Sequence, residues 1–282
     1  MYSGRWVGMG AAAAMLITVV MPAVFPRVQA SRDGGAPVRS FMPVAQSNLQ
    51  DRSGAEPFSE SADATERMDK VRFDPVVRQI EGWTVSVDPS LLEGEHSEMG
   101  GRAMKMLANH LQRIAILVPQ EQLARMQKLG IWIEHHHPTL GAMQYHPSVG
   151  WLKSHGHDPR LAKKVHIPRA ESLLSRHQMI KHPAVVLHEL AHAYHDQYLG
   201  SDEPRIVEAY EKAKAAGTYE NVLLYTGQRV RHYAMTDQKE YFAEGTEAYF
   251  YRNDFYPFVR AELKEHDPVL HDLLSDIWGP LQ

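Results

Sequence analysis

The sequence contains no cysteine, and this absence excludes several kinds of chemistry at once. A chain without thiols forms no disulfide framework, no cysteine-ligated zinc site, no iron–sulfur cluster and no thiol nucleophile. Any metal that the protein binds must therefore be held by histidine, aspartate or glutamate.

The chain also lacks a strong excess of charge of either sign. Its 30 lysine and arginine residues and 34 aspartate and glutamate residues give a formal net charge of −4, and the basic residues are scattered. Nucleic-acid-binding proteins gather positive charge on one face or stripe, so we expect no nucleic-acid partner. With 282 residues, of which 44% are hydrophobic, the chain is long and apolar enough to bury one sizeable core.

Residues 1–30 have the features of a secretory signal peptide. Arg5 precedes an uncharged, mostly apolar stretch over residues 6–25, and Val28 and Ala30 occupy the minus-three and minus-one positions of a cleavage site. About 20 apolar residues can also span a bilayer, so an uncleaved membrane anchor is the alternative, although two glycines and a proline interrupt the stretch. We expect cleavage and export to the medium, the periplasm or the cell surface, with no stable membrane partner afterwards.

Residues 31–70 differ in composition from the rest of the chain. They are rich in serine, glycine, proline and acidic residues and show no sustained apolar period. Such a segment cannot bury enough apolar surface to offset the entropy lost on ordering, so we expect a flexible linker. The remaining residues, 71–282, are expected to form one compact catalytic domain.

The order of strand and helix patterns predicts an α+β domain. Apolar and polar residues alternate over residues 83–87, which is typical of a strand. Further strands are expected at residues 131–134 and 142–146, joined as a hairpin, and at 164–167. Helices are expected at residues 104–114, 123–129, 183–199, 203–216, 237–251, 256–265 and 268–277. Because the expected strands lie in the first half of this segment and most of the helices in the second, we expect a small mixed or antiparallel sheet followed by a mostly helical half.

One of these helices carries a metal-binding pattern. His188, Glu189 and His192 form the sequence HELAH within the helix expected over residues 183–199. Residues four apart lie on one face of a helix, so two imidazoles can bind one zinc ion while Glu189 reaches a metal-bound water. In a chain with 17 histidines the pattern can also arise by chance on an exposed helix. Its place in an apolar helix, with an acidic helix following, favours two zinc ligands and a general base.

A catalytic zinc ion needs a third protein ligand. The acidic helix expected over residues 237–251 offers Glu240, Glu244 and Glu247, which can all lie near one face. Glu240 can be the third ligand, with Glu244 one turn later placed to accept a hydrogen bond from a ligand histidine. The spacing alone leaves the choice among the three glutamates open.

Together, HELAH, Tyr233 and the sequence EYFAE at residues 240–244 resemble the glutamate-ligated zincins, and specifically the anthrax lethal factor and Pro-Pro endopeptidase group. Tyr233 precedes Glu240 by seven positions, as in that group. The resemblance covers only residues 183–251. It implies a zincin-like fold with these roles: zinc ligands His188, His192 and Glu240, general base Glu189, electrophile Tyr233, and Glu244 supporting a ligand histidine.

These residues predict an exported zinc metallopeptidase that acts on a peptide or protein substrate. A secreted zinc-binding or scaffold protein without catalysis is one alternative, but a site that only binds metal has no need of a base such as Glu189. A metallohydrolase acting on a non-peptide amide is the other alternative.

Other residues have roles that the sequence leaves open. His232 is an alternative electrophile to Tyr233, and Asp196 either supports the site or solvates its helix. Residues 143–146 are expected to form an edge strand to which a peptide can add by main-chain pairing. Three consecutive histidines, at 135–137, cannot converge on one ion if they lie in a strand, because successive side chains point to opposite faces.

Overall fold

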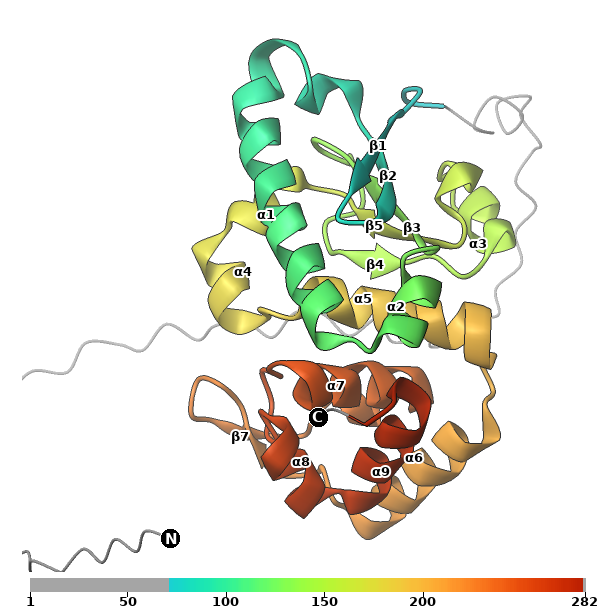
Figure 1. Cartoon of the computed structure of the whole chain (residues 1–282), viewed down its shortest axis with the longest axis vertical. Helices are drawn as coiled ribbons and strands as arrows, with labels where there is room; N and C mark the ends of the chain where they lie inside the picture. The colour runs from blue at the N-terminus through green and yellow to red at the C-terminus, as the bar shows by residue number, and fades with distance from the viewer. Residues whose placement is uncertain (1–70, 281–282) are drawn as a thin grey trace, which may run out of the picture. The chain divides into compact units, whose positions relative to one another are not determined.

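The structure of the protein is a computed structural model that describes residues 71–280. The signal peptide and linker expected over residues 1–70 lie outside the described residues. None of the helices in the described part is long and apolar enough to cross a bilayer. In chain order the helices and strands are β1 (Val76–Ile80), β2 (Trp83–Val87), α1 (Ser97–Leu117), α2 (Gln120–Met126), β3 (Gly130–Ile133), β4 (Gln144–Tyr145), α3 (Val149–Ser154), β5 (Lys164–Ile167), α4 (Arg176–Lys181), α5 (Val185–Tyr194), α6 (Pro204–Ala216), β6 (Val222–Leu223), β7 (Arg229–Val230), α7 (Gln238–Phe250), α8 (Arg260–His266) and α9 (Pro268–Trp278) (Figure 1).

The first half of the described chain is built on a mixed five-stranded sheet in the order β1-β2-β3-β5-β4. Strands β2, β3 and β5 run parallel, while β1 and β4 are antiparallel to their neighbours. Alternation along β3 turns Ile131 and Ile133 toward the main core, which includes α1 and α5, and Trp132 toward a smaller cluster with Leu152 of α3. The predicted α+β class, a small sheet followed by a mostly helical half, is confirmed.

The expected hairpin of residues 131–134 and 142–146 is wrong. Strand β5 lies between β3 and β4, so the two segments are not neighbours, and β4 is the edge strand. The pairing of β3 with β5 sets two pairs of buried aliphatic side chains side by side, Ile131 with Val165 and Ile133 with Ile167. We attribute the strand order to this burial, which outweighs the short connection between β3 and β4.

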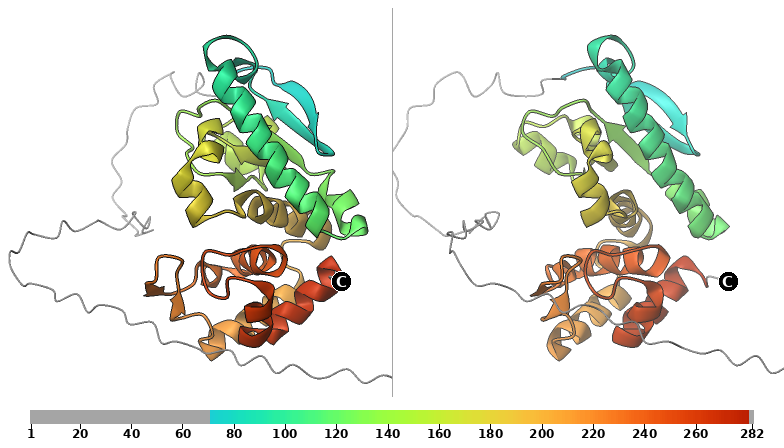
Figure 2. Two further views of the ribbon diagram at one scale, coloured as in Figure 1. Left: turned by 60° about the vertical axis from the view of Figure 1, so that its left-hand side comes forward. Right: turned by 90° about the vertical axis from the view of Figure 1, so that its left-hand side faces the viewer.

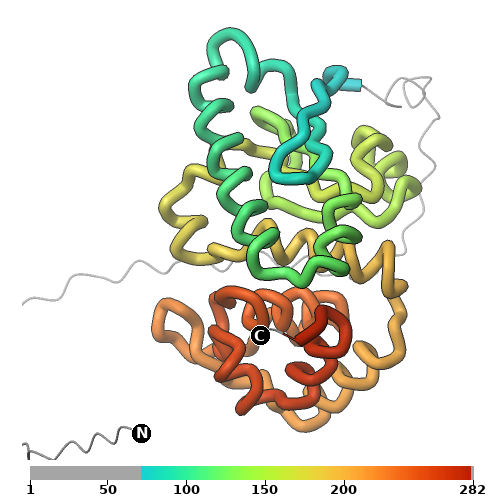
Figure 3. Tube along the Cα trace, viewed as in Figure 1, coloured from blue at the N-terminus to red at the C-terminus, as the bar shows by residue number. Residues whose placement is uncertain are grey.

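The second half of the described chain is helical and meets the first half where α7 packs against α5 (Figure 2). Asp237 caps α7 by accepting hydrogen bonds from the backbone N–H groups of Lys239 and Glu240. On the far side of α7, a Cβ at Gly245 would lie 2.7 Å from Cδ2 of Leu270, so the absence of a side chain lets α9 pack closely. The chain passes from α5 to α6 and then returns through α7 to the contact with α5 (Figure 3).

Three buried histidines make the fold sensitive to acid. Burial lowers the pKa of His110 from 6.5 to about 4, and it lowers the pKa of His146 and of His232 from 6.5 to about 3. Each ring is therefore neutral in the folded protein at neutral pH. The unfolded chain binds protons first, so the stability these groups contribute is complete above pH 6.5 and is lost as the pH falls toward the folded values.

We predict that each of these histidines contributes a fall in the free energy of unfolding of on the order of 1 kcal/mol between pH 7.5 and pH 5.5. His110→Leu removes one titrating group from a buried position and should flatten the pH dependence by about that amount. Urea denaturation of both proteins at the two pH values measures the effect. An equal pH dependence in wild type and variant would contradict the assignment.

Candidate metal centre

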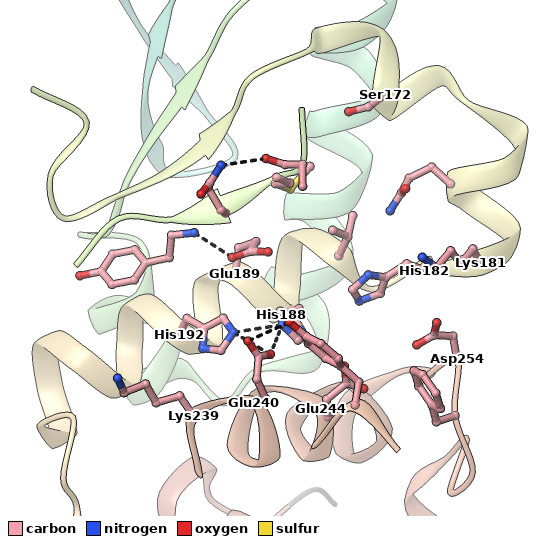
Figure 4. Close-up of a pocket in the computed structure, with 18 of the residues that line it drawn as sticks. Ser172, Lys181, His182, His188, Glu189, His192, Lys239, Glu240, Glu244 and Asp254 are labelled. Atoms are coloured by element: carbon pink, nitrogen blue, oxygen red, sulfur yellow. Dashed lines mark hydrogen bonds and ion pairs between the residues drawn. The ribbon is translucent and has the colours of Figure 1, made fainter. Parts of the chain in front are cut away.

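The packing of α5 against α7 brings three candidate metal-ligand atoms together (Figure 4). Nε2 of His188 and Nε2 of His192 lie 3.0 Å apart, one helical turn from each other on α5. Oε2 of Glu240, in the first turn of α7, lies 3.2 Å from the first nitrogen and 3.3 Å from the second. The four-residue spacing thus places both imidazoles on the face of α5 that meets α7.

These three residues fit a zinc ion. Oε2 of Glu240 is buried and accepts no hydrogen bond from the residues that the structure describes, although two imidazole nitrogens face it. Tetrahedral zinc with bonds of about 2.0 Å separates its ligand atoms by about 3.3 Å, close to the spacing seen here. Two histidines and a glutamate are also a donor set that catalytic zinc uses, with one position left for water or substrate.

The electrostatics of Glu240 agree with this fit. Burial alone would raise the pKa of its carboxyl group, but the adjacent imidazoles of His188 and His192 lower that pKa well below its usual range. The carboxylate is therefore ionised at neutral pH and can act as a ligand.

A second group of three possible ligands shares His188 but has a different geometry. Nδ1 of His188 lies 2.6 Å and Nε2 of His182 lies 2.8 Å from Oε1 of Glu247. These distances are hydrogen-bond lengths, shorter than the spacing of atoms around a zinc ion. Because a carboxylate only accepts, His188 donates through Nδ1, which leaves the lone pair of Nε2 directed at the first group.

The hydrogen bond expected of Glu244 is made by Glu247 instead. Oε1 of Glu244 lies 4.0 Å from Nδ1 of His188, and Oε2 accepts a hydrogen bond of 2.6 Å from the Asn253 amide. Burial, together with the nearby charge of Glu247, raises the pKa of Glu244 to about 8. Seven residues are close to two full turns of a helix, so Glu247 returns to the face occupied by Glu240 more closely than Glu244 does.

Glu189 lies on α5 between the two candidate ligand histidines in sequence, and its carboxylate contacts the edge of the sheet. Its Oε2 accepts a hydrogen bond of 2.8 Å from the backbone N–H of Tyr145 in the edge strand β4. Burial raises the pKa of the Glu189 carboxyl group above its ordinary value. The edge strand and the expected base are therefore in direct contact.

Tyr233 and His232 have opposite environments. The hydroxyl of Tyr233 lies 3.4 Å from Oε1 of Glu240, and the side chain is half exposed in the cleft. His232 is buried, accepts a hydrogen bond from the backbone N–H of Ala234 and stacks on Phe255. The structure thus places the phenol, and not the alternative imidazole, beside the candidate ligands.

A cleft of about 920 Å³ runs past these groups. One wall comes from β4, α4 and α5, and the other comes from α7 and the turn at residues 224–226. The cleft extends beyond the candidate ligand atoms in two directions, with Lys181 and Asp254 toward one end and Lys239 toward the other (Figure 4).

The other residues left open by the sequence do not join the ligands. Asp196 accepts hydrogen bonds from the Tyr145 hydroxyl and from Lys163, so it anchors the edge strand. His135 stacks on His96, His136 is exposed, and His137 is buried with its Nδ1 accepting backbone N–H groups. The consecutive histidines lie beyond the end of β3, so the strand argument does not apply, but their side chains have separate partners and do not converge on one ion.

Sequence reasoning missed three residues that the structure places at the site: His182, Tyr145 and the supporting role of Glu247. Tyr145 acts through its backbone N–H, which no side-chain pattern reveals. Glu247 had a usable signal, the seven-residue spacing from Glu240. His182 lies six residues before His188, and a turn separates α4 from α5. Helical spacing therefore cannot predict that the two histidines lie close together.

No family model matches the chain, and no curated protein matches it. Among solved structures the chain is similar to the Pro-Pro endopeptidase PPEP-2 from Paenibacillus alvei, with 20% sequence identity over 71% of this chain and 99% of that chain and a TM-score of 0.39. The geometry of the site therefore carries the functional argument by itself.

We predict different effects of two isosteric substitutions on zinc affinity. Glu247→Gln removes the charged acceptor of the His188 hydrogen bond and should weaken zinc binding roughly 10- to 100-fold. Glu244→Gln alters a group that the fold keeps protonated and should leave zinc affinity nearly unchanged. Competition with a chromophoric chelator measures both affinities. The reverse order of effects would restore Glu244 as the supporting residue.

Proposed function

We propose that the protein is an exported zinc-dependent metallopeptidase. The observation that carries this proposal is the convergence of His188, His192 and Glu240, with the Glu189 carboxylate beside them in an open cleft. A site that only binds metal does not require the Glu189 carboxylate. Three ligands, a neighbouring base and room for a substrate are what metal-assisted hydrolysis of an amide bond requires.

The residues of this chain have separate roles in the proposed reaction. A bound zinc ion lowers the pKa of water and polarises the substrate carbonyl. Glu189 takes the proton of the attacking water and passes it to the nitrogen of the leaving amine. The hydrogen bond from the Tyr145 N–H holds one oxygen of Glu189, so the other oxygen is free for this transfer. No covalent intermediate is required.

Tyr233 is proposed to donate a hydrogen bond to the oxyanion that develops on the substrate carbonyl. Burial and the nearby charge of Glu240 raise the pKa of Tyr233 to about 12, so the phenol keeps its proton at neutral pH. Its exposed position beside Glu240 supports contact with substrate. Such a donor lowers the barrier because the charge it meets exists only in the transition state.

The edge strand supports a peptide as the substrate in preference to a small amide. Strand β4 borders the cleft and pairs with β5 on one side only. An extended peptide can add to such an edge through main-chain hydrogen bonds. The cleft also continues on both sides of the candidate ligands, which suits a substrate with residues on both sides of the bond that is cut.

Glu189→Gln tests the proposed base. The substitution is nearly isosteric and removes no ligand, so zinc content should be retained while hydrolysis nearly vanishes. The measurement is mass-spectrometric mapping of new termini in a peptide library treated with the purified protein, with the variant as control.

The outcomes separate the proposed peptidase from its alternatives. Peptide maps in which neither wild type nor Glu189→Gln produces new termini would contradict a peptidase. They would direct attention to a binding protein, or to a hydrolase of non-peptide amides if small amide substrates were still cleaved.

Tyr233→Phe tests the proposed electrophile. The hydroxyl acts only in the transition state, so kcat should fall by on the order of 10² to 10³-fold with little change in KM. Zinc content and melting temperature should stay the same because the side chain is half exposed. A fully active variant would refute the catalytic role of Tyr233.

A further inference from the structure

One carboxylate oxygen behind the candidate metal centre has two imidazole partners from different elements. Oε1 of Glu247 on α7 lies 2.6 Å from Nδ1 of His188 on α5 and 2.8 Å from Nε2 of His182, which directly follows α4. The side chain of Glu247 is fully buried, whereas that of His182 is 18% exposed and lines the cleft (Figure 4). His182 therefore touches both the cleft and the carboxylate that supports a candidate ligand.

The hydrogen bonds from these two histidines stabilise the buried carboxylate of Glu247. Its second oxygen, Oε2, is buried and has no hydrogen-bond partner among the residues that the structure describes, 71–280. Burial of a carboxylate without such partners is strongly unfavourable. If His182 no longer donated, Glu247 would have one partner left, and a shift of the carboxylate toward another donor would release Nδ1 of His188.

The position of His182 is itself well defined. Its backbone N–H donates a hydrogen bond of 2.8 Å to the carbonyl of Gln178 in the last turn of α4, and Pro183 follows. Because carboxylate oxygens only accept, Nε2 of His182 must carry the hydrogen of the bond to Glu247. Its Nδ1 makes no hydrogen bond within the described part of the chain.

We propose that His182 is a positioning residue of the metal centre. Its Nε2–H holds Oε1 of Glu247 where that oxygen orients the imidazole of His188, so a residue of the cleft wall controls the geometry of a ligand. The proposal rests on the zinc site of the proposed function. The sequence pattern that identifies the ligands assigns no role to position 182.

Two amide variants test whether the Nε2–H of His182 is the group that matters. His182→Gln places an amide N–H near the position of Nε2, whereas His182→Asn is too short to reach Glu247. His182→Ala is a second variant without the donor, in case the asparagine variant does not fold. His136→Asn, at an exposed histidine outside the cleft, is the matched control.

The readouts are the zinc dissociation constant, from competition with a chromophoric chelator, and the visible absorption spectrum of the cobalt(II)-substituted protein. Circular dichroism checks that each variant is folded. His182→Asn and His182→Ala should weaken zinc binding by about tenfold or more and shift the cobalt bands. His182→Gln should restore both toward the wild-type values, and His136→Asn should change neither.

Two results would overturn the positioning role while leaving the proposed peptidase intact. One is wild-type zinc affinity and wild-type cobalt bands in the variants without the donor. The other is an equal loss in the asparagine and glutamine variants, because the Nε2–H donor would then not be the group that matters. A wild-type protein that binds no zinc would overturn both the positioning role and the proposed function.

Discussion

Three glutamate side chains of one interior helix must be accommodated where α7 packs against α5. Glu244 and Glu247 are buried, and Glu240 is largely so. Burying an ionised carboxylate costs several kcal/mol unless partners compensate it. Each glutamate is stabilised in a different way. Glu247 accepts hydrogen bonds from two histidines, and Glu244 is held protonated beside Asn253. Glu240 faces the two imidazole nitrogens where we propose a zinc ion.

This constraint explains why the candidate site lies where the two halves of the described chain meet. The apolar face of α5 packs in the core under the sheet, and α7 is fixed from behind by α9. The same contact brings the edge strand into the site, because Tyr145 donates its backbone N–H to Glu189 and its hydroxyl to Asp196. One packing arrangement therefore positions the candidate ligands, the proposed base and the edge strand.

Much of this arrangement could be predicted from the sequence, and the exceptions have physical reasons. The helix carrying HELAH follows from its apolar face, and the four-residue spacing explains why His188 and His192 meet. The strand order could not be predicted, because it depends on long-range burial of aliphatic residues in β3 and β5. Strand β1 was missed because most of its side chains are exposed and show no alternation.

The supporting residues of the site were the hardest to predict. A spacing rule can say that Glu244 and Glu247 lie near one face, but only the packing of α7 against α5 decides which carboxylate reaches Nδ1 of His188. His182 comes from a helix with no buried residue, so its sequence gives no apolar pattern that would place it. Contacts of this kind arise from the three-dimensional arrangement of three elements and not from the pattern of any one.

The most direct test of the account is the position of the metal in crystals of the zinc-loaded protein, located by anomalous scattering at the zinc absorption edge. The account predicts one strong peak within bonding distance, about 2.0 to 2.2 Å, of Nε2 of His188, Nε2 of His192 and Oε2 of Glu240. A peak between His182, Nδ1 of His188 and Glu247, or no peak on α5 at all, would contradict it.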